Sequence, residues 1–566
     1  MSSVRLGFVV SVFLTGVAAQ PLLPETPAQE QRRAQERERA LREQLLPTPD
    51  VRLQGKPAPE QGRLPGAELP CFVIQTVNLR GEGDAPRQFD WLLDTMAGPD
   101  SDDSPVGRCL GAQGINLVLK RAQDALLARG FVTSRILAEP QDLKNGVLTL
   151  TVLPGRIRAV RFAPGGSAHG NAWNALAVAP GAVLNLRDIE QALENFKRVP
   201  TAEADIQIEP AELPGQSDLV ISYKQALPFR LSLSADDGGS KSTGKYQGGV
   251  TLSVDNPLAL NDLLYVSVNG DLGGGLDGER GTGGSTAHYS VPFGYWLIGA
   301  TASNNRYRQS VAGLNQTYVY RGTSSNAEFK LSRLVYRDAV RKTTVALSAF
   351  RRTSNNYIDD TEIEVQQRKA GGWQVALNHR EFIGQSTLDA TLAYKRGTGA
   401  FHSLPAPEEA FGEGTSRFKL ITLDASLNVP FQAAGQKLRY NASARVQANR
   451  SPLTPQDRFA IGGRYTVRGF DGESSLVAER GWLLRNDLGI ALGSSGQELY
   501  AGLDHGEVSG PSAEFLSGRR LTGAVLGLRG NFKGMSYDVF VGQPINKPEG
   551  FITASTTAGI SLNYSF

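Results

Sequence analysis

Strict alternation of apolar and polar residues dominates the C-terminal part of the chain. Residues 421 to 429, ITLDASLNV, place five apolar side chains on one face of an extended strand and four polar side chains on the other. Residues 387 to 394, 438 to 446 and 558 to 566 repeat this alternation. Sheets with one apolar face fit either a soluble sandwich or a membrane barrel, so the alternation alone leaves both folds open.

Three further features favour the barrel. The strand patterns are about nine or ten residues long, and the second face of each strand is polar. Short turns alternate with longer loops rich in Gly, Ser and Asn, such as 270 to 287. At roughly 21 residues per strand and connection, residues 228 to 566 provide about sixteen strands. We therefore expect a transmembrane β-barrel of about sixteen antiparallel strands.

Between residues 71 and 227 the pattern is mixed, and it occurs twice. Residues 71–154 and residues 155–227 each open with a strand, continue with two helical patterns and close with two strands. In the second unit, the helical pattern from Leu186 to Arg198 follows Asn185, a residue type that caps helix N-termini. The sequence predicts two α+β domains, each in β-α-α-β-β order.

The N-terminal region contains a charged helix pattern and a linker. Within residues 20–46, charges of opposite sign recur at helical spacing, as in Glu38 with Arg42, and the apolar stripe is thin. Such a helix has little core to join, so it is either a solvated spacer or an occupant of a polar, water-lined channel. Residues 47–70 carry six prolines, which predicts an extended linker.

The first nineteen residues have the pattern of a secretory signal. Arg5 precedes an apolar run from Leu6 to Val17, and small residues follow at the expected cleavage site. A run of about a dozen apolar residues is short for a membrane anchor, which needs roughly 20. We expect residues 1–19 to direct export, after which the mature chain is either soluble or inserted in an outer membrane as a closed barrel.

The chain has two cysteines, Cys71 and Cys109. In an oxidising compartment the expected state is a disulfide that closes a loop of about 39 residues, and two buried free thiols are the alternative. The formal net charge of +3 gives no reason to expect a nucleic acid partner.

No enzymatic, metal or cofactor motif is found. The five histidines are scattered and share no motif with a cysteine. Residues 239 to 245, GSKSTGK, imitate a phosphate-binding loop, but Tyr246 stands where a hydroxyl residue would hold magnesium. We interpret this segment as a polar hairpin and expect neither enzymatic chemistry nor a cofactor.

Three segments resemble the motifs of two-partner-secretion transporters, the TpsB family. They are LSADDGGSKSTGKYQGGVTLSVDNPLALNDLL at 231–264, FAIGGRYTVRGFDGE at 459–473 and LYAGLDHGEV at 499–508. The two mixed units are similar to POTRA domains, so the resemblance covers essentially the whole mature chain. The first segment departs from the pattern, because DDGG stands at 236–239 where many relatives have Asp-Asn.

The resemblance implies a sixteen-stranded barrel, two periplasmic POTRA domains that capture an unfolded exoprotein, and an N-terminal helix that plugs the pore. It also implies a loop that folds back into the barrel and presents the V-R-G-F tip, here Val467, Arg468, Gly469 and Phe470. The acid on the inner wall that matches the family motif is Asp504. The implied partners are a large secreted exoprotein of the TpsA type, outer-membrane lipid and the barrel-insertion machinery, with a monomeric transporter.

Alternation within 499–506 supports the same pairing independently. If Leu499 and Leu503 face lipid, Asp504 faces the lumen, where a loop arginine can form a charge-assisted contact with it. The alternative is that Arg468 only caps its own turn near Asp471. The last strand ends in Phe566, which resembles the C-terminal aromatic signal of outer-membrane barrels, although an aromatic at a strand end can also arise by chance.

Taken together, the sequence predicts an outer-membrane pore that exports one large protein, either an adhesin, a haemolysin or a contact-dependent toxin. Two rival functions share the barrel. A barrel-assembly factor has the same V-R-G-F loop but inserts other proteins into the membrane, and a passive porin or receptor leaves the tandem domains without a role.

Overall fold

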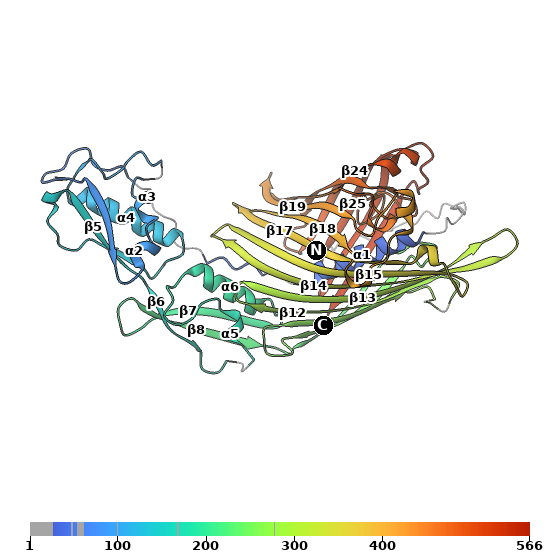
Figure 1. Cartoon of the computed structure of the whole chain (residues 1–566), viewed down its shortest axis with the longest axis horizontal. Coiled ribbons are helices and arrows are strands. Elements are labelled where there is room, and N and C mark those ends of the chain that lie inside the picture. The colour runs from blue at the N-terminus through green and yellow to red at the C-terminus, as the bar shows by residue number, and fades with distance from the viewer. Residues whose placement is uncertain are drawn as a thin grey trace, which may run out of the picture.

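The computed structural model describes residues 26–46, 49–53, 62–98, 100–166, 169–274, 276 and 278–566. The expected signal at 1–19 lies outside these residues. The described chain forms a large barrel and an arm of two small α+β domains that extends from one end of it (Figure 1). None of the described helices is long and apolar enough to span a membrane.

Within the described residues, sixteen antiparallel strands close the barrel in sequence order, as expected. The first, β9 (Phe229–Asp236), pairs with the last, β27 (Thr557–Ser565). The others are β10 (Gln247–Asp255), β11 (Leu263–Asp271), β12 (Gly281–Phe293), β13 (Trp296–Ala312), β14 (Thr317–Arg337), β15 (Arg341–Ile358), β17 (Arg368–Ile383), β18 (Ser386–Thr398), β19 (Lys419–Ala433), β20 (Gln436–Asn449), β23 (Arg480–Ala491), β24 (Gln497–Ser509), β25 (Arg520–Phe532) and β26 (Met535–Asn546). The two-residue β16 (Thr361–Glu362) only extends β15.

Two expectations about the barrel were wrong in detail. The strands are not uniformly nine or ten residues long, because β14 has 21 residues and β9 has 8. The expected loop at 270–287 is shorter than predicted, since β11 ends at Asp271 and β12 begins at Gly281 and pairs with β13 along its whole length. Backbone pairing satisfies N–H and C=O groups whatever the side chains are, so a Gly- and Ser-rich segment can still form a strand.

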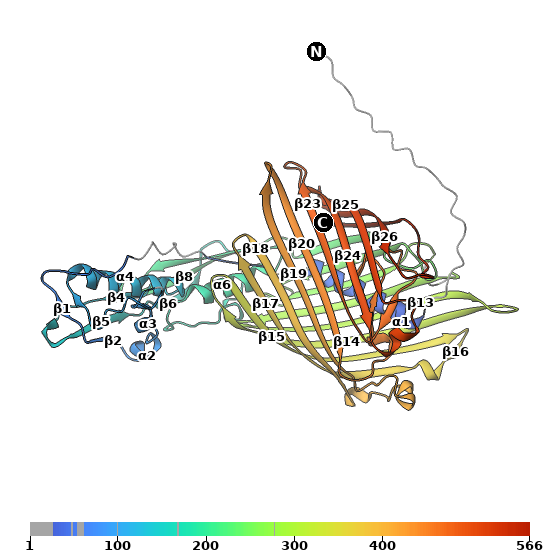
Figure 2. The same ribbon diagram turned by 90° about the horizontal axis from the view of Figure 1, so that it is seen from above.

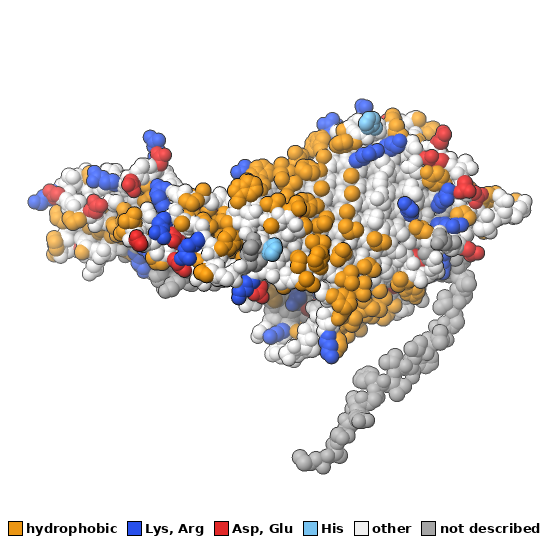
Figure 3. Space-filling model, turned by 90° about the horizontal axis from the view of Figure 1, so that it is seen from below, with side chains coloured by type: hydrophobic (Ala, Val, Ile, Leu, Met, Phe, Trp, Pro, Cys, Tyr) orange, Lys and Arg blue, Asp and Glu red, His pale blue; other side chains and the backbone are white. Residues whose placement is uncertain are grey.

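Many large hydrophobic side chains are exposed along the barrel strands, and they gather over part of the face of the barrel seen in Figure 3. On β24, Leu499 and Leu503 are 40% and 54% exposed, whereas Tyr500 and Asp504, which follow them directly, are buried. This alternation places the leucines on the outside and the carboxylate in the lumen, as the sequence indicated.

The first arm domain contains a three-stranded sheet, in which β2 (Thr76–Gly81) and β5 (Val147–Leu153) are parallel and β4 (Arg135–Leu137) is antiparallel. Its helices are α2 (Ala85–Gln88), α3 (Leu92–Thr95) and α4 (Ala112–Ala128), and a small second sheet pairs β1 (Phe72–Val73) with β3 (Cys109–Leu110). A disulfide joins Cys71 to Cys109 beside that sheet. β4 has only three residues, because turn hydrogen bonds after α4 occupy the residues before it.

The second arm domain has the expected order, with β6 (Arg156–Phe162), α5 (Ala172–Ala175), α6 (Leu186–Lys197), β7 (Ala202–Pro210) and β8 (Gln216–Gln225). In its sheet β8 lies between β6 and β7. The side chain of Asn185 accepts a hydrogen bond from the Arg187 amide at 2.8 Å and caps α6.

The charged helix α1 (Pro27–Leu45) lies inside the barrel (Figures 1 and 2). Thr26 and Gln29 form a reciprocal capping box at its N-terminus. Of the two alternatives that the sequence left open, the structure has the channel occupant and not the solvated spacer. The remaining described elements are β21 (Phe459–Ile461), β22 (Leu476–Ala478) and the 3-10 turns at Leu143–Asn145, Glu364–Gln366, Ala400–His402, Pro407–Phe411, Pro455–Asp457 and Pro511–Phe515.

Candidate functional site

The loop between β20 and β23 folds back into the lumen through the short hairpin of β21 and β22. Its tip contains the four residues of the V-R-G-F motif. Val467 and Phe470 are almost fully buried, in an apolar cluster with Ile461, Leu476 and Leu521. Burial of these two side chains holds the tip against the wall. Because Arg468 lies between them in the chain, its backbone is held in place as well.

Arg468 donates three hydrogen bonds to Asp504 on β24. Its backbone N–H and its Nε reach Oδ2 at 3.0 and 2.7 Å, and its Nη2 reaches Oδ1 at 2.8 Å. Both side chains are buried, at 3% and 0% exposure. A bidentate, charge-assisted contact of this kind fixes both the position and the rotation of the guanidinium.

A second carboxylate binds the same guanidinium, and the sequence reasoning missed it. Asp487 on β23 accepts from Arg468 Nη2 at 2.5 Å and from Arg529 Nη1 at 3.1 Å. The strand register places Asp487 opposite Gly502, two residues before Asp504. Alternation along RNDLGIA would have placed Asp487 in the lumen, but no motif linked it to the loop.

Glycines in the wall provide the space for the tip. A Cβ at Gly502 would lie 2.6 Å from Asp487 Oδ1 and 2.8 Å from Arg468 Nη2, and a Cβ at Gly523 would lie 1.9 Å from the Arg468 carbonyl oxygen. Gly469 itself has a φ of +92°, which favours glycine. The tip therefore fits only against a wall that lacks side chains at these positions.

The alternative role for Arg468, capping its own turn near Asp471, is not what the structure has. Asp471 accepts instead from the Ala554 amide at 3.0 Å and from the Thr553 hydroxyl at 3.1 Å. Asp471 therefore fixes the base of the tip to the segment before β27, while Arg468 binds the wall.

Further cations surround the pair of carboxylates. Arg485 Nε lies 3.7 Å from Asp504 Oδ2, and the Arg529 guanidinium lies 4.6 Å from the centre of the Tyr500 ring. Removing one member of a buried network leaves the others unpaired in a poorly solvated site, which costs about 3 to 5 kcal/mol. Among the described residues no cluster of three or more His, Cys, Asp or Glu side chains could hold a metal ion.

The helix α1 contacts both the loop and the wall. Arg32 and Arg33 donate to the carbonyl oxygens of Pro455 and Gly472 at 2.6 and 2.5 Å. Toward its C-terminal end, Arg39 lies 3.1 Å from Asp424 and Arg42 lies 3.5 Å from Glu328. Because these contacts are polar and partly exposed, each one stabilises the position of the helix only slightly. Several of them together hold the helix in the lumen.

The hairpin that imitates a phosphate loop contacts both α1 and the loop. The Thr243 hydroxyl donates to Glu30 Oε2 of α1 at 3.1 Å, and the Lys241 amide donates to Glu473 Oε1 of the loop at 3.0 Å. The hairpin, the loop and the helix thus contact one another within the lumen.

At the other end of the barrel, the second arm domain packs on the turns between strands. Arg198 Nη1 donates to the carbonyl oxygens of Asn261 and Ser290 at 3.1 and 3.2 Å, and Asn195 donates to that of Gly294 at 2.8 Å.

Phe566 lies at the seam between β27 and β9, where its amide donates to the Leu231 carbonyl at 2.9 Å. Its ring packs against Tyr564, with centroids 4.5 Å apart.

Comparison with known proteins identifies this combination of barrel, loop and arm. Residues 215–530 match the family model of the haemolysin secretion/activation protein ShlB/FhaC/HecB. The chain belongs to this family. Residues 156–210 and 102–155 match models of a POTRA domain and of a ShlB-type POTRA domain. The chain is therefore an outer-membrane transporter of the two-partner-secretion type, and its arm consists of periplasmic POTRA domains.

Relatives cover nearly the whole chain. The outer membrane transporter CdiB-2 of Burkholderia pseudomallei is 37% identical over 580 residues, which is 98% of both chains. The solved CdiB structure from Acinetobacter baumannii superimposes with a TM-score of 0.83 at 29% identity, over 96% of this chain and 100% of that one. CdiB from Escherichia coli gives the same TM-score at 25% identity, over 96% and 100%.

Proposed function

We propose that this transporter exports one large exoprotein through a pore that α1 closes at rest. The observation that carries the proposal is the position of α1, whose arginines pair with Asp424 and Glu328 on the inner wall. A helix held by partly exposed polar contacts can be displaced more easily than one packed by an apolar face. The two POTRA domains lie at the entrance and capture the exoprotein in an unfolded state.

The loop has a separate role in this proposal. Arg468, bound to Asp504 and Asp487, holds the V-R-G-F tip against the wall and so keeps the lumen at a width that an extended chain can pass. The exported chain enters as an added strand on a POTRA sheet, since edges of small sheets accept extended segments. Folding of the exoprotein outside the cell supplies the free energy.

Three further parts of the proposal concern the surroundings of the barrel. The apolar outer wall contacts outer-membrane lipid, the C-terminal Phe566 is recognised by the barrel-insertion machinery, and the transporter acts as a monomer. We propose that the segment at 1–19 directs export to the periplasm, and that the chain has no enzymatic activity and needs no cofactor.

The test is secretion of a TpsA-type exoprotein that is expressed together with this transporter. Cells that carry both genes should release the exoprotein, and cells that lack the transporter should retain it in the periplasm while their other outer-membrane barrels stay at normal levels. Loss of many barrels together with the transporter would instead identify a barrel-assembly factor.

A further inference from the structure

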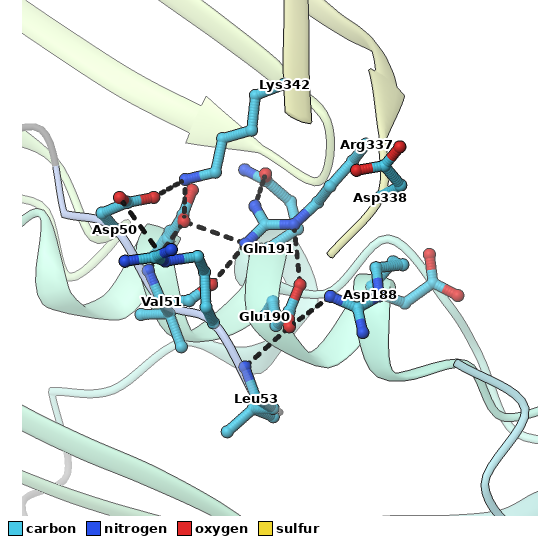
Figure 4. Close-up of polar contacts among 12 residues, drawn as sticks. Asp50, Val51, Leu53, Asp188, Glu190, Gln191, Arg337, Asp338 and Lys342 are labelled. Carbon is cyan, nitrogen blue, oxygen red and sulfur yellow. Dashed lines mark hydrogen bonds and ion pairs between the residues drawn. The ribbon is translucent and has the colours of Figure 1, made fainter. Parts of the chain in front are cut away.

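Three parts of the chain that are far apart in sequence meet at the periplasmic mouth of the barrel (Figure 4). They are the linker segment 49–53, the helix α6 of the second POTRA domain, and the turn that joins β14 to β15. The linker segment lies only a few residues after the end of α1. What holds this segment therefore also determines where the C-terminal end of the plug can lie.

The linker is bound to α6 through its backbone. The amide of Val51 donates to Glu194 Oε1 at 3.0 Å, and the amide of Leu53 donates to Glu190 Oε1 at 2.7 Å. The side chains of Val51 and Leu53 pack on the apolar core of the second POTRA domain. The side chains of these alternate residues thus pack on one surface of the domain, and their backbone amides donate hydrogen bonds to two carboxylates.

Arg337, at the end of β14, closes the site from the barrel side. Its guanidinium donates to the Val51 carbonyl oxygen at 2.6 Å, to Glu190 at 3.0 Å and to Glu194 at 3.0 Å. Its side chain is 2% exposed and that of Glu190 is 0% exposed, so these charges have no water to replace a lost partner. On β15, opposite Arg337, Lys342 donates to Asp50 Oδ1 at 2.5 Å and also contacts Glu194.

We propose that Val51 and Leu53, packed on the second POTRA domain, hold linker residues 50–53 on α6 together with the positioning residues Arg337 and Lys342, and thereby keep α1 in the pore. The proposal rests on the proposed role of α1 as the plug. We call residues 50–53, with their partners on α6 and at the adjoining ends of β14 and β15, the anchor. The anchor includes residues of both the POTRA domain and the barrel. A movement of the POTRA domain relative to the barrel therefore separates Arg337 from Glu190 and Glu194 and breaks its hydrogen bond to the Val51 carbonyl oxygen.

The chain between α1 and the next fixed residue acts as a tether, and its length determines how strongly loss of the anchor affects closure of the pore by α1. From Leu45, the last residue of α1, to Asp50 there are five residue steps, or at most about 17 Å of extended chain. Without the anchor, the next described residue held by a contact is Gly62, whose carbonyl oxygen accepts from Arg121 at 3.0 Å, seventeen steps from Leu45. The effective concentration of α1 at its site in the pore falls as about the −3/2 power of tether length. Loss of the anchor therefore lowers this effective concentration about sixfold.

The experiment measures the ratio of open to closed time of the full-length protein in planar bilayers. The main variant is Val51→Asp with Leu53→Asp, which places two carboxylates beside Glu190 and Glu194 but leaves the ion pairs of Arg337 in place. Hydrogen exchange of the peptide that covers 49–53 reports whether the linker is released. We expect faster exchange and an open-to-closed ratio about six times that of the parent protein.

Two further variants separate positioning from general damage. Arg341→Ala is the matched control, because Arg341 lies beside Lys342 at the start of β15 and pairs with the partly exposed Glu381 at 2.9 Å, away from the linker. It should leave both readouts unchanged. In a protein that also lacks residues 27–45, the anchor variant should leave conductance unchanged, since there is no plug to position.

The results have distinct meanings. Faster exchange at 49–53 with an unchanged open-to-closed ratio would overturn the positioning role, while secretion and the Arg468 results could still support the proposed function. Unchanged exchange would show that Val51 and Leu53 do not hold the linker, which also overturns the proposal. An unchanged conductance after deletion of 27–45 alone would refute the plug itself, and the anchor's role with it.

Discussion

Arg468 and Asp504 are joined by three hydrogen bonds, although one lies at the tip of a loop and the other in the middle of a barrel strand. One of the three comes from the backbone of Arg468, so the contact fixes the chain as well as the side chain. Asp487 completes the site from the neighbouring strand. The loop is therefore fastened to two adjacent strands of the wall at once.

Replacement of the arginine should release the loop. We expect Arg468→Ala to abolish secretion while the barrel remains in the outer membrane, because the variant leaves Asp504 and Asp487 buried without their shared cation, at a cost of about 3 to 5 kcal/mol. Secretion of the exoprotein and heat-modifiable migration of the barrel measure the two effects. Arg468→Lys should also impair export, since an ammonium group cannot make the bidentate contact. Normal export by the alanine variant would exclude the loop from the mechanism.

The two carboxylates should differ in importance. Asp504 is fully buried and accepts three bonds from Arg468, whereas Asp487 also pairs with Arg529. We expect Asp504→Asn to loosen the loop and reduce secretion more than Asp487→Asn does. Hydrogen exchange of the peptide that covers 463–472 would measure the loosening. Equal effects of the two substitutions would contradict this ranking.

Removal of the helix should open the pore. Deletion of residues 20–46, or of 27–45 alone, should raise the ion conductance in planar bilayers, because α1 occupies the lumen and its charged side chains contact the wall. A matched variant, Arg39→Ala, removes two partly exposed ion pairs, with Glu43 and Asp424, and should have only a small effect. Equal conductance of the deleted and the parent protein would mean that the helix does not close the pore.

The disulfide should stabilise the first POTRA domain. Cys71 and Cys109 close a loop with a sequence separation of 38 residues. In the chain-entropy model such a crosslink contributes about 4 kcal/mol by restricting the unfolded chain. Cys71→Ser with Cys109→Ser should therefore lower the denaturant midpoint of this domain in the full-length protein, as followed by hydrogen exchange of 112–128. An unchanged midpoint would argue against a structural role for the crosslink.

Acid should weaken the same domain through Asp103. Burial alone would raise the pKa of Asp103, but the Leu64 amide and the guanidinium groups of Arg121 and Arg108 outweigh it and hold that pKa below its ordinary value. A lowered pKa in the folded state stabilises the domain above the unfolded value of about 3.9, and this contribution is lost as the pH falls through the folded pKa.

The pH dependence is measured as protection of 112–128 against hydrogen exchange, corrected for the intrinsic rate, between pH 6 and pH 3. Protection should fall with pH in the parent protein. Asp103→Asn should be less protected at pH 6 and should change less with pH, because its side chain cannot titrate. The same slope in both proteins would assign the acid sensitivity to other groups.

Much of the architecture followed from local pattern. Period-two alternation predicted the strands and which face of β24 carries Asp504, and the confirmed barrel of sixteen strands followed from the length of the region. The two α+β units followed from their repeated order, and the V-R-G-F motif led to the loop. Strand lengths were predicted poorly, because Gly- and Ser-rich segments such as 281–287 pair with neighbours despite their composition.

The sequence by itself determined the faces of the strands, the helical character of residues 27–45 and the candidate pair of Arg468 and Asp504, because these depend on local periodicity and on a motif. Only the tertiary structure placed Asp487 on the same guanidinium and Arg337 against the linker. Those contacts join segments tens to hundreds of residues apart. They depend on strand register and on how the POTRA domain sits against the barrel, which no local pattern encodes.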